Sequence, residues 1–236
     1  MSRPVRYAVY LAPAADSALW RFGCAILGRD AETGAEPAPP DLAGFDAERW
    51  REITAEPRRY GFHGTLKAPF SLKPGLDEAA LLEAVAAVAA EHRPFELPPL
   101  AVSAIGRFVA LTPQVAVPTL DDIAACVVTD LDPLRAPLTD GERARRRPHL
   151  LSPRQVELLD TCGYPYVLEE FRFHMTLTGP LGEAEQGHAL NALADAFAAS
   201  GARVPAEITD LAVFAEPARG APFRLIQRMP LGVAVD

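Results

Sequence analysis

The sequence is poor in cysteine and has no long apolar run. Its three cysteines, Cys24, Cys126 and Cys162, lie far apart among 236 residues and form no metal-ligand spacing. So low and odd a count indicates a reducing compartment, with thiols packed as small hydrophobic side chains. No segment approaches the roughly 20 apolar residues of a membrane span, and residues 1–13 are too interrupted for a signal peptide. We therefore expect a soluble, cytoplasmic protein without a membrane partner.

Basic residues are also fewer than acidic residues. The chain has 23 Lys and Arg against 31 Asp and Glu, a net charge of -8. This balance argues against broad, non-specific binding of nucleic acid and disfavours a long nucleic-acid partner. A small anionic ligand would need a local basic pocket, because the overall field of the chain repels it. Hydrophobic residues make up 49% of the sequence and charged residues 23%, which is typical of a globular domain with a sizeable core.

Periodicity and turn residues predict the same order of elements twice: strand, helix, strand, strand. The first set covers residues 63–70, 77–92, 100–105 and 107–111; the second covers 171–178, 183–199, 204–215 and 222–231. The remaining predictions are a strand at 5–11, helices at 16–27, 47–53 and 120–131, a loop at 30–41, and a Pro- and Arg-rich connector at 132–152. This order predicts an α+β fold of two mainly antiparallel sheets that face a central cleft, with helices outside.

We expect one bilobed domain over residues 1–236. One lobe would surround the first set of elements, about residues 40–115, and the other the second set, about residues 150–236. The terminal strands could belong to either lobe.

Two octets are the most informative feature of the chain. Phe62-His63-Gly64-Thr65-Leu66-Lys67-Ala68-Pro69 and Phe173-His174-Met175-Thr176-Leu177-Thr178-Gly179-Pro180 are identical at five of eight positions, each separated by 111 residues. Self-similarity at a fixed offset indicates a duplicated unit. Because side chains alternate faces along a strand, His63 and Thr65 share one face, as do His174 and Thr176. A pseudo-twofold arrangement of the lobes would line one cleft with all four.

Two histidines across a cleft can perform acid–base chemistry on a phosphodiester. A neutral imidazole takes a proton from the attacking hydroxyl or water, and the protonated one gives its proton to the leaving oxygen. The Thr65 and Thr176 hydroxyls can donate hydrogen bonds to the oxygens on which charge develops. This chemistry requires no metal and no cofactor. A single His-x-Thr would be read as a structural histidine, but two copies in matched contexts favour the catalytic interpretation.

The octets differ at one polar position, where Thr178 stands in place of Lys67. If Lys67 points the same way as His63 and Thr65, its cation would lower the pKa of His63 and favour His63 as the base. His174 would then be the acid.

Other side chains are candidates to bind an anionic substrate, because Arg offers bidentate bonds to phosphate. Together with Lys67, they are Arg58, Arg59, Tyr60, Arg172, Arg224 and Tyr10. The alternative for each arginine is a solvated surface residue, and for each tyrosine a packed ring. The run 143–147, with four arginines, lies beside acidic residues and is better explained as a solvated loop than as a nucleic-acid site.

Three stretches carry a family resemblance: residues 58–70, residues 163–166 leading to 171–178, and residues 222–225. They resemble the 2H (two-histidine) phosphoesterase superfamily, in particular its branch of phosphonate-metabolism proteins. The resemblance implies the bilobed, pseudo-twofold 2H phosphoesterase-like fold and a metal-independent cyclic phosphodiesterase, a hydrolase of a small phosphorylated sugar or nucleotide. It makes His63 and His174 the acid–base pair and Thr65 and Thr176 the phosphate-holding hydroxyls. The link to phosphonate breakdown suggests a ribose cyclic phosphate.

Two other functions remain open at this stage. One is a phosphodiesterase for 2′,3′-cyclic ends or 2′,5′ links of RNA; the other is a non-catalytic sensor of a nucleotide or phosphosugar. The sequence leaves the true substrate, the bond specificity and the oligomeric state undecided.

Overall fold

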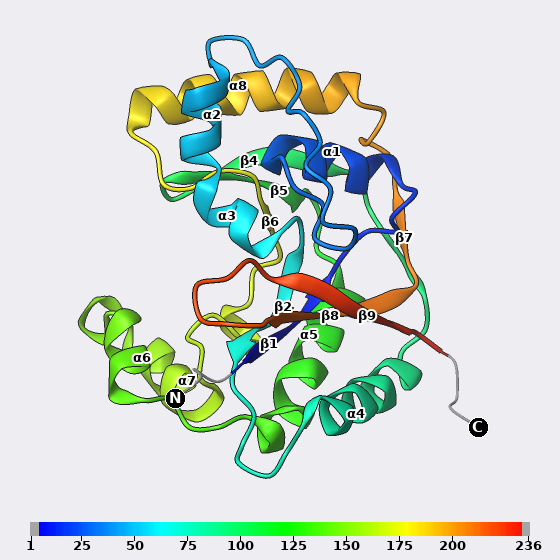
Figure 1. Ribbon diagram of the computed structural model, residues 1–236, viewed down its shortest axis with the longest axis vertical. Coiled ribbons are helices and arrows are strands. Elements are labelled where there is room, and N and C mark those ends of the chain that lie inside the picture. The colour runs from blue at the N-terminus through cyan, green and yellow to red at the C-terminus, as the bar shows by residue number, and fades with distance from the viewer. Residues whose placement is uncertain (1–4, 233–236) are drawn as a thin grey trace.

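Helices cover the outer sides of one long antiparallel sheet in the computed structural model, which describes residues 5–232 (Figure 1). In spatial order the seven strands are β4 (Leu100–Ile105), β5 (Phe108–Pro113), β6 (Met175–Thr176), β2 (Gly64–Phe70), β1 (Arg6–Leu11), β8 (Asp210–Glu216) and β9 (Arg224–Pro230). A separate two-stranded ribbon pairs β3 (Phe95–Leu97) with β7 (Ala206–Ile208). The α+β class, the antiparallel pairing and the outer position of the helices are as predicted.

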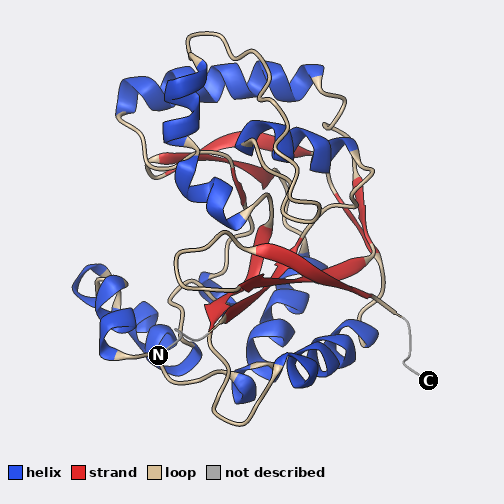
Figure 2. Cartoon of the chain, viewed as in Figure 1, coloured by secondary structure: helices blue, strands red, loops and turns tan. Residues whose placement is uncertain are grey.

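The helices divide between the two ends of the sheet (Figure 2). α8 (Glu183–Ala199) packs on β4 and β5, and α1 (Ala18–Leu27), α2 (Ala47–Ile53) and α3 (Ala55–Tyr60) lie at the same end. α4 (Glu78–Ala90) packs on β8 and β9, and α5 (Pro118–Asp130) packs on β2. α6 (Asp140–Arg145) and α7 (Pro153–Cys162) project to one side. None of the helices within residues 5–232 is long and apolar enough to cross a membrane.

Helix α4 shows how local sequence fixes an element. The Asp77 side chain accepts a hydrogen bond from the Ala80 amide and so caps the first turn. Leu81, Val85 and Val88 then fall on one face at helical spacing and are buried. That face packs against β8 and β9, and its burial, not the intrinsic helix propensity, supplies most of the stability of the helix.

The two halves of the sheet meet at a single residue pair, Gly64 of β2 and Met175 of β6. These two residues occupy the same position in the two octets, so an antiparallel pair between them creates a local twofold axis. The two sheets that we predicted are therefore continuous through this junction. Gly64 is required there, because an added Cβ would lie 2.2 Å from the Phe173 ring.

Each half of the sheet takes strands from both parts of the chain. The β4–β5 hairpin follows the first octet but pairs with β6 of the second, whereas the β8–β9 hairpin follows the second octet but continues the β2–β1 pair of the first. We expected that only the terminal strands could belong to either lobe, whereas in the structure whole hairpins are exchanged. The predicted boundaries at about 40–115 and 150–236 do not divide the sheet, because antiparallel pairing connects hairpins across the duplicated units.

Three of the predicted segments differ in the structure, and α3 and β3 were not predicted. Of the strand predicted at 171–178 only Met175–Thr176 joins the ladder, because Leu177 and Thr178 both direct their amides at one carbonyl, that of Val109. The strand predicted at 204–215 is divided into β7 and β8. The connector at 132–152 contains helix α6, and α7 follows it; Thr139 with Glu142 and Ser152 with Gln155 form capping boxes that mark both starts.

Candidate active site

A cleft of about 330 Å³ lies over the junction of β2 and β6. Its size is within the range of small-molecule sites. The cleft brings together His63, Thr65, His174 and Thr176 from the two octets. The other residues around it are Arg6, Tyr10, Glu56, Pro57, Tyr60, Gly61, Ala68, Pro69, Phe108, Arg146, Tyr164, Thr178, Gly179 and Pro180. The Gly64–Met175 register places His63 opposite Thr176 and Thr65 opposite His174.

Both histidines are oriented by the same backbone contact. Nδ1 of His63 lies 2.9 Å from the carbonyl oxygen of Gly61, and Nδ1 of His174 lies 2.8 Å from that of Arg172. A carbonyl only accepts, so each Nδ1 must carry the proton. In both octets the partner is two residues earlier in the chain. Nε2 is therefore the nitrogen left for chemistry on each ring.

The first octet also contains a contact between its two polar residues. Nε2 of His63 lies 3.1 Å from the hydroxyl oxygen of Thr65. Because Nδ1 holds the proton in the neutral ring, Nε2 accepts and the hydroxyl donates. Gly61 itself has a positive φ of 82°, a conformation that favours glycine.

His63 is enclosed by aromatic rings. Tyr10 stacks on it with centroids 3.6 Å apart and an interplanar angle of 17°, and Phe214 and Tyr60 lie farther off. Burial lowers the pKa of His63 to about 4, opposed by the Gly61 hydrogen bond and assisted by the nearby His174. The ring is therefore neutral near pH 7. The direction of the shift agrees with our prediction, but its cause differs.

Lys67 does not face the cleft, contrary to our prediction. Its side chain is only 4% exposed, and Nζ donates to the Val128 carbonyl of α5 at 2.9 Å, with Asp132 at 3.5 Å. The strict alternation that we assumed is broken by a bulge: Tyr10 pairs with Thr65 but Val9 pairs with Lys67, which leaves an extra residue in β2. The bulge turns Lys67 to the α5 side of the sheet, so this cation does not set the pKa of His63.

Thr178, which matches Lys67 in the second octet, lies at the cleft but is fully buried. Its hydroxyl accepts from the Val109 amide at 3.0 Å and donates to the Gly179 carbonyl at 2.9 Å. Both bonds hold the end of the octet in place, so Thr178 is a structural residue here.

The predicted anion contacts divide into two groups. Tyr10 and Tyr60 line the cleft, whereas Arg58, Arg59, Arg172 and Arg224 are not among its lining residues. Arg58 donates to the Leu27 carbonyl and the Thr54 hydroxyl, Arg59 pairs with Glu216, and Arg172 bonds the Glu169 and Phe171 carbonyls. These three guanidinium groups are used to hold the backbone or a buried carboxylate, and Arg224 is exposed on β9.

The cleft residues that the sequence analysis missed include Arg6, Arg146 and Tyr164. Arg6 precedes Tyr10 by four residues on a predicted strand, so the alternation rule could have placed both on one face. Arg146 belongs to the run 143–147, which we interpreted as a solvated loop. Arg143 of that run does pair with Asp160, but Arg146 turns inward, with its guanidinium 4.7 Å from the centroid of the Tyr164 ring.

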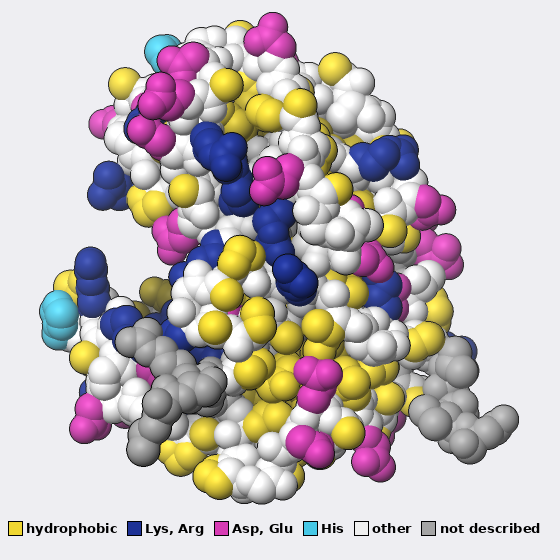
Figure 3. Space-filling model, in the orientation of Figure 1, with side chains coloured by type: hydrophobic (Ala, Val, Ile, Leu, Met, Phe, Trp, Pro, Cys, Tyr) yellow, Lys and Arg dark blue, Asp and Glu magenta, His cyan; other side chains and the backbone are white. Residues whose placement is uncertain are grey.

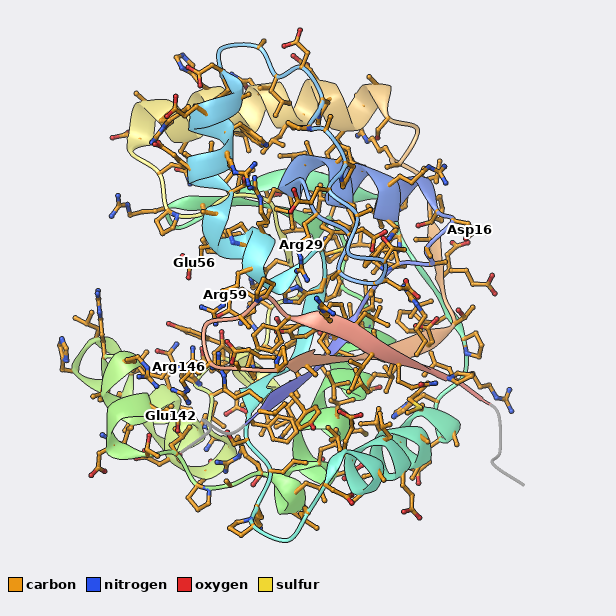
Figure 4. The ribbon with its side chains drawn as sticks, viewed as in Figure 1. Asp16, Arg29, Glu56, Arg59, Glu142 and Arg146 are labelled. Carbon is orange, nitrogen blue, oxygen red and sulfur yellow. The ribbon has the colours of Figure 1, made fainter. Side chains whose placement is uncertain are left out.

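The mouth of the cleft lies between α3 and the end of α6. Glu56 and Arg59 lie on α3 on one side, and Arg146 lies after α6 on the other (Figure 4). Basic side chains gather around the hollow between the main body and the α6–α7 projection (Figure 3). Within residues 5–232 no group of three His, Cys, Asp or Glu side chains is placed to hold a metal ion, and Cys24 is buried.

Comparison with known proteins gives a family and two curated relatives. A family model described as "Protein of unknown function (DUF1045)" matches residues 65–224. Two proteins named ribose 1,5-bisphosphate phosphokinase PhnN are similar: one from Janthinobacterium sp. (strain Marseille) is 39% identical over 95% of this chain, and one from Laribacter hongkongensis is 38% identical over 94%. This chain spans 50% of the length of each. The matches agree with the family resemblance that we predicted.

Solved structures show a weaker likeness. Escherichia coli LigT complexed with 3′-AMP is 15% identical, with a TM-score of 0.43 over 97% of this chain and 99% of that one. Kluyveromyces marxianus Usb1 is 11% identical, with a TM-score of 0.38 over 98% of this chain and 99% of that one. With TM-scores below 0.5, these likenesses support no inference about function, and the fold stands on the strand order described above.

Proposed function

This chain belongs to the family described as protein of unknown function (DUF1045), and we propose that it is a metal-independent cyclic phosphodiesterase of a small phosphorylated ribose or nucleotide. One observation carries the proposal: two histidines in one cleft both hold their Nδ1 proton on a backbone carbonyl and so leave Nε2 for proton transfer. A binding protein has no need of such a matched pair.

The proposed reaction uses the two rings in different roles. A water oxygen attacks phosphorus, and Nε2 of His63 takes the proton that the water loses. The bond from phosphorus to the leaving oxygen breaks, and Nε2–H of His174 gives that oxygen its proton. His63 is suited to the base because its lowered pKa keeps it neutral near pH 7. The Thr176 hydroxyl donates to a non-bridging oxygen as its charge grows. The Thr65 hydroxyl donates to Nε2 of His63 in this structure, and it turns to a non-bridging oxygen once Nε2 takes the water proton and can no longer accept.

The names of the curated relatives support a ribose phosphate as substrate. Those proteins are about twice as long as this chain and are named as phosphokinases of ribose 1,5-bisphosphate. The sequence of this chain contains no Gly-x-x-x-x-Gly-Lys-Ser/Thr loop, the element that holds nucleotide phosphates in P-loop kinases. We therefore do not propose phosphokinase activity for this chain. Opening a cyclic phosphate of a phosphorylated ribose would yield a ribose bisphosphate, the kind of compound in the names of these relatives. This relation supports the proposed activity in phosphonate breakdown.

Turnover of a generic substrate tests the proposal. The purified chain should hydrolyse adenosine 2′,3′-cyclic phosphate to a monoester, in the presence of EDTA as well as in its absence. His63→Ala and His174→Ala should each lose about 10²- to 10⁴-fold in kcat/KM. His149→Ala, at an exposed position outside the cleft, should keep the wild-type rate.

Two outcomes would contradict the proposal. Undiminished turnover in both cleft variants would remove the central claim. Loss of turnover in EDTA would contradict the metal-independent reaction.

A further inference from the structure

One end of the cleft contains a cluster of cations and hydroxyls that the proposed reaction does not use. Arg6 and Tyr10 on β1, Tyr60 at the end of α3, and Arg146 and Tyr164 from the α6–α7 projection all line it. Arg6 and Tyr10 are four residues apart on one strand face, about 13 Å along the strand. Because Tyr10 stacks on His63, the cluster extends from the reacting histidines toward the start of β1.

The Tyr10 hydroxyl adds a hydrogen-bond donor to this end of the cleft. The Tyr10 side chain is 1% exposed and lines the cleft, yet its hydroxyl has no hydrogen-bond partner among residues 5–232. A hydroxyl that makes no bond to a protein group is free to bond to water or to a ligand oxygen. Burial raises the pKa of this hydroxyl, so it keeps its proton and can donate.

The arginines give this end a positive charge. Glu216 is fully buried and accepts hydrogen bonds from Nε of Arg6 at 2.6 Å and Nη2 of Arg59 at 3.0 Å. One carboxylate is thus shared by two guanidinium groups. Neither Nη group of Arg6 makes a hydrogen bond within the described part of the chain. Arg146 has no ion pair within that part and is oriented by the Tyr164 ring. The one carboxylate that lines the cleft is exposed Glu56.

We infer that Arg6, Arg146 and the Tyr10 hydroxyl form a second anion subsite, which binds a phosphate monoester carried by the substrate in addition to its cyclic diester. Arg is suited to this because its planar N–H groups match phosphate oxygens. The inference rests on the proposed function for the identity of the diester and names its substrate class: a sugar phosphate with two separate phosphate groups. The net charge of -8 makes such a local cluster necessary, because the chain as a whole repels anions.

Binding without turnover tests the subsite. In a His63→Gln background, calorimetry compares adenosine 2′,3′-cyclic phosphate with the same compound carrying a 5′-phosphate. The added phosphate should lower Kd by about 10- to 100-fold, the range expected for charge-assisted hydrogen bonds. Arg146→Gln should remove most of this gain and change Kd of the unphosphorylated probe by a much smaller factor. Arg6→Lys, which keeps a cation beside Glu216, should reduce the gain in part.

Arg145→Gln is the matched control, because it removes the same charge from the neighbouring residue. The Arg145 side chain is 62% exposed and lies outside the cleft. It should bind both probes as the background does. The subsite is overturned if the 5′-phosphate gives no gain, including the case in which neither probe binds, or if Arg145→Gln and Arg146→Gln lose equally. The proposed reaction is judged separately, from wild-type turnover of the unphosphorylated probe.

Discussion

The two octets place the same chemical group in different surroundings. His63 precedes a seven-residue strand and is stacked by Tyr10, with Phe214 and Tyr60 nearby. His174 precedes a two-residue strand, and its aromatic neighbour is Phe108, tilted by 46° at 5.6 Å. Both rings nevertheless bond the carbonyl two residues earlier through Nδ1. The local sequence thus determines the orientation of each ring, and the elements packed around His63 lower its pKa.

In the reaction that we propose, this difference makes His63 the base and His174 the acid. A duplicated motif on a twofold axis would by itself give two equivalent groups, and two equivalent groups do not distinguish the base from the acid. Tyr10 of β1 breaks the equivalence because it buries His63. The second octet pairs with β5, whose Ala110 lies opposite Thr176, so no ring of that kind covers His174 from the matching side.

The largest expected effect comes from removing either ring. Wild-type kcat/KM should fall as the pH is lowered through about 4, because protonation of His63 removes the base. In His63→Ala that acid limb should disappear, together with about 10²- to 10⁴-fold of the rate. In His174→Ala the rate should fall by a similar factor, but the acid limb should remain. If both variants lose the same limb in measured pH–rate profiles, the assignment of roles is wrong.

The second-largest expected effect is a loss of stability at the junction between the octets. Gly64→Ala should lower the free energy of unfolding by about 1–3 kcal/mol, the usual cost of overpacking, because the new Cβ would meet the Phe173 ring at 2.2 Å. Denaturant titration measures it. Gly187→Ala in α8, with open space around its Cβ, is the control and should stabilise the chain slightly. Equal stability of wild type and Gly64→Ala would show that the two strands do not need this close approach.

Much of the fold follows from local signals. The 183–199 helix was predicted with its observed bounds, and the strand at 5–11 within one residue, since apolar spacing and turn residues act over short distances. The His-x-Thr faces were found because alternation holds over three residues. The Gly64–Met175 junction and the exchange of hairpins depend on pairing between distant segments, which periodicity does not encode. Lys67 was misplaced for a related reason: a single extra residue in the ladder reverses the face.

A smaller effect is expected from the ring that covers His63. Tyr10→Leu removes the stacked aromatic ring and opens His63 to water, so the pKa of His63 should rise from about 4 by roughly one unit toward its ordinary value. NMR titration of the imidazole signals measures this, with Tyr7→Leu, a tyrosine of β1 outside the cleft, as the control. An unchanged pKa would show that Tyr10 is not the group that excludes water from the first octet.

The smallest effect concerns the position that first distinguished the octets. Lys67→Met should leave the acid limb of the pH–rate profile where it is, because the Lys67 ammonium bonds the Val128 carbonyl of α5 and does not face His63. The loss should be limited to stability, and Asp132 retains its pair with Arg135. If the acid limb instead moves to higher pH by about one unit in Lys67→Met, the Lys67 cation does act on His63. The asymmetry of the two histidines would then come from the sequence difference between the octets and not from the burial of one ring.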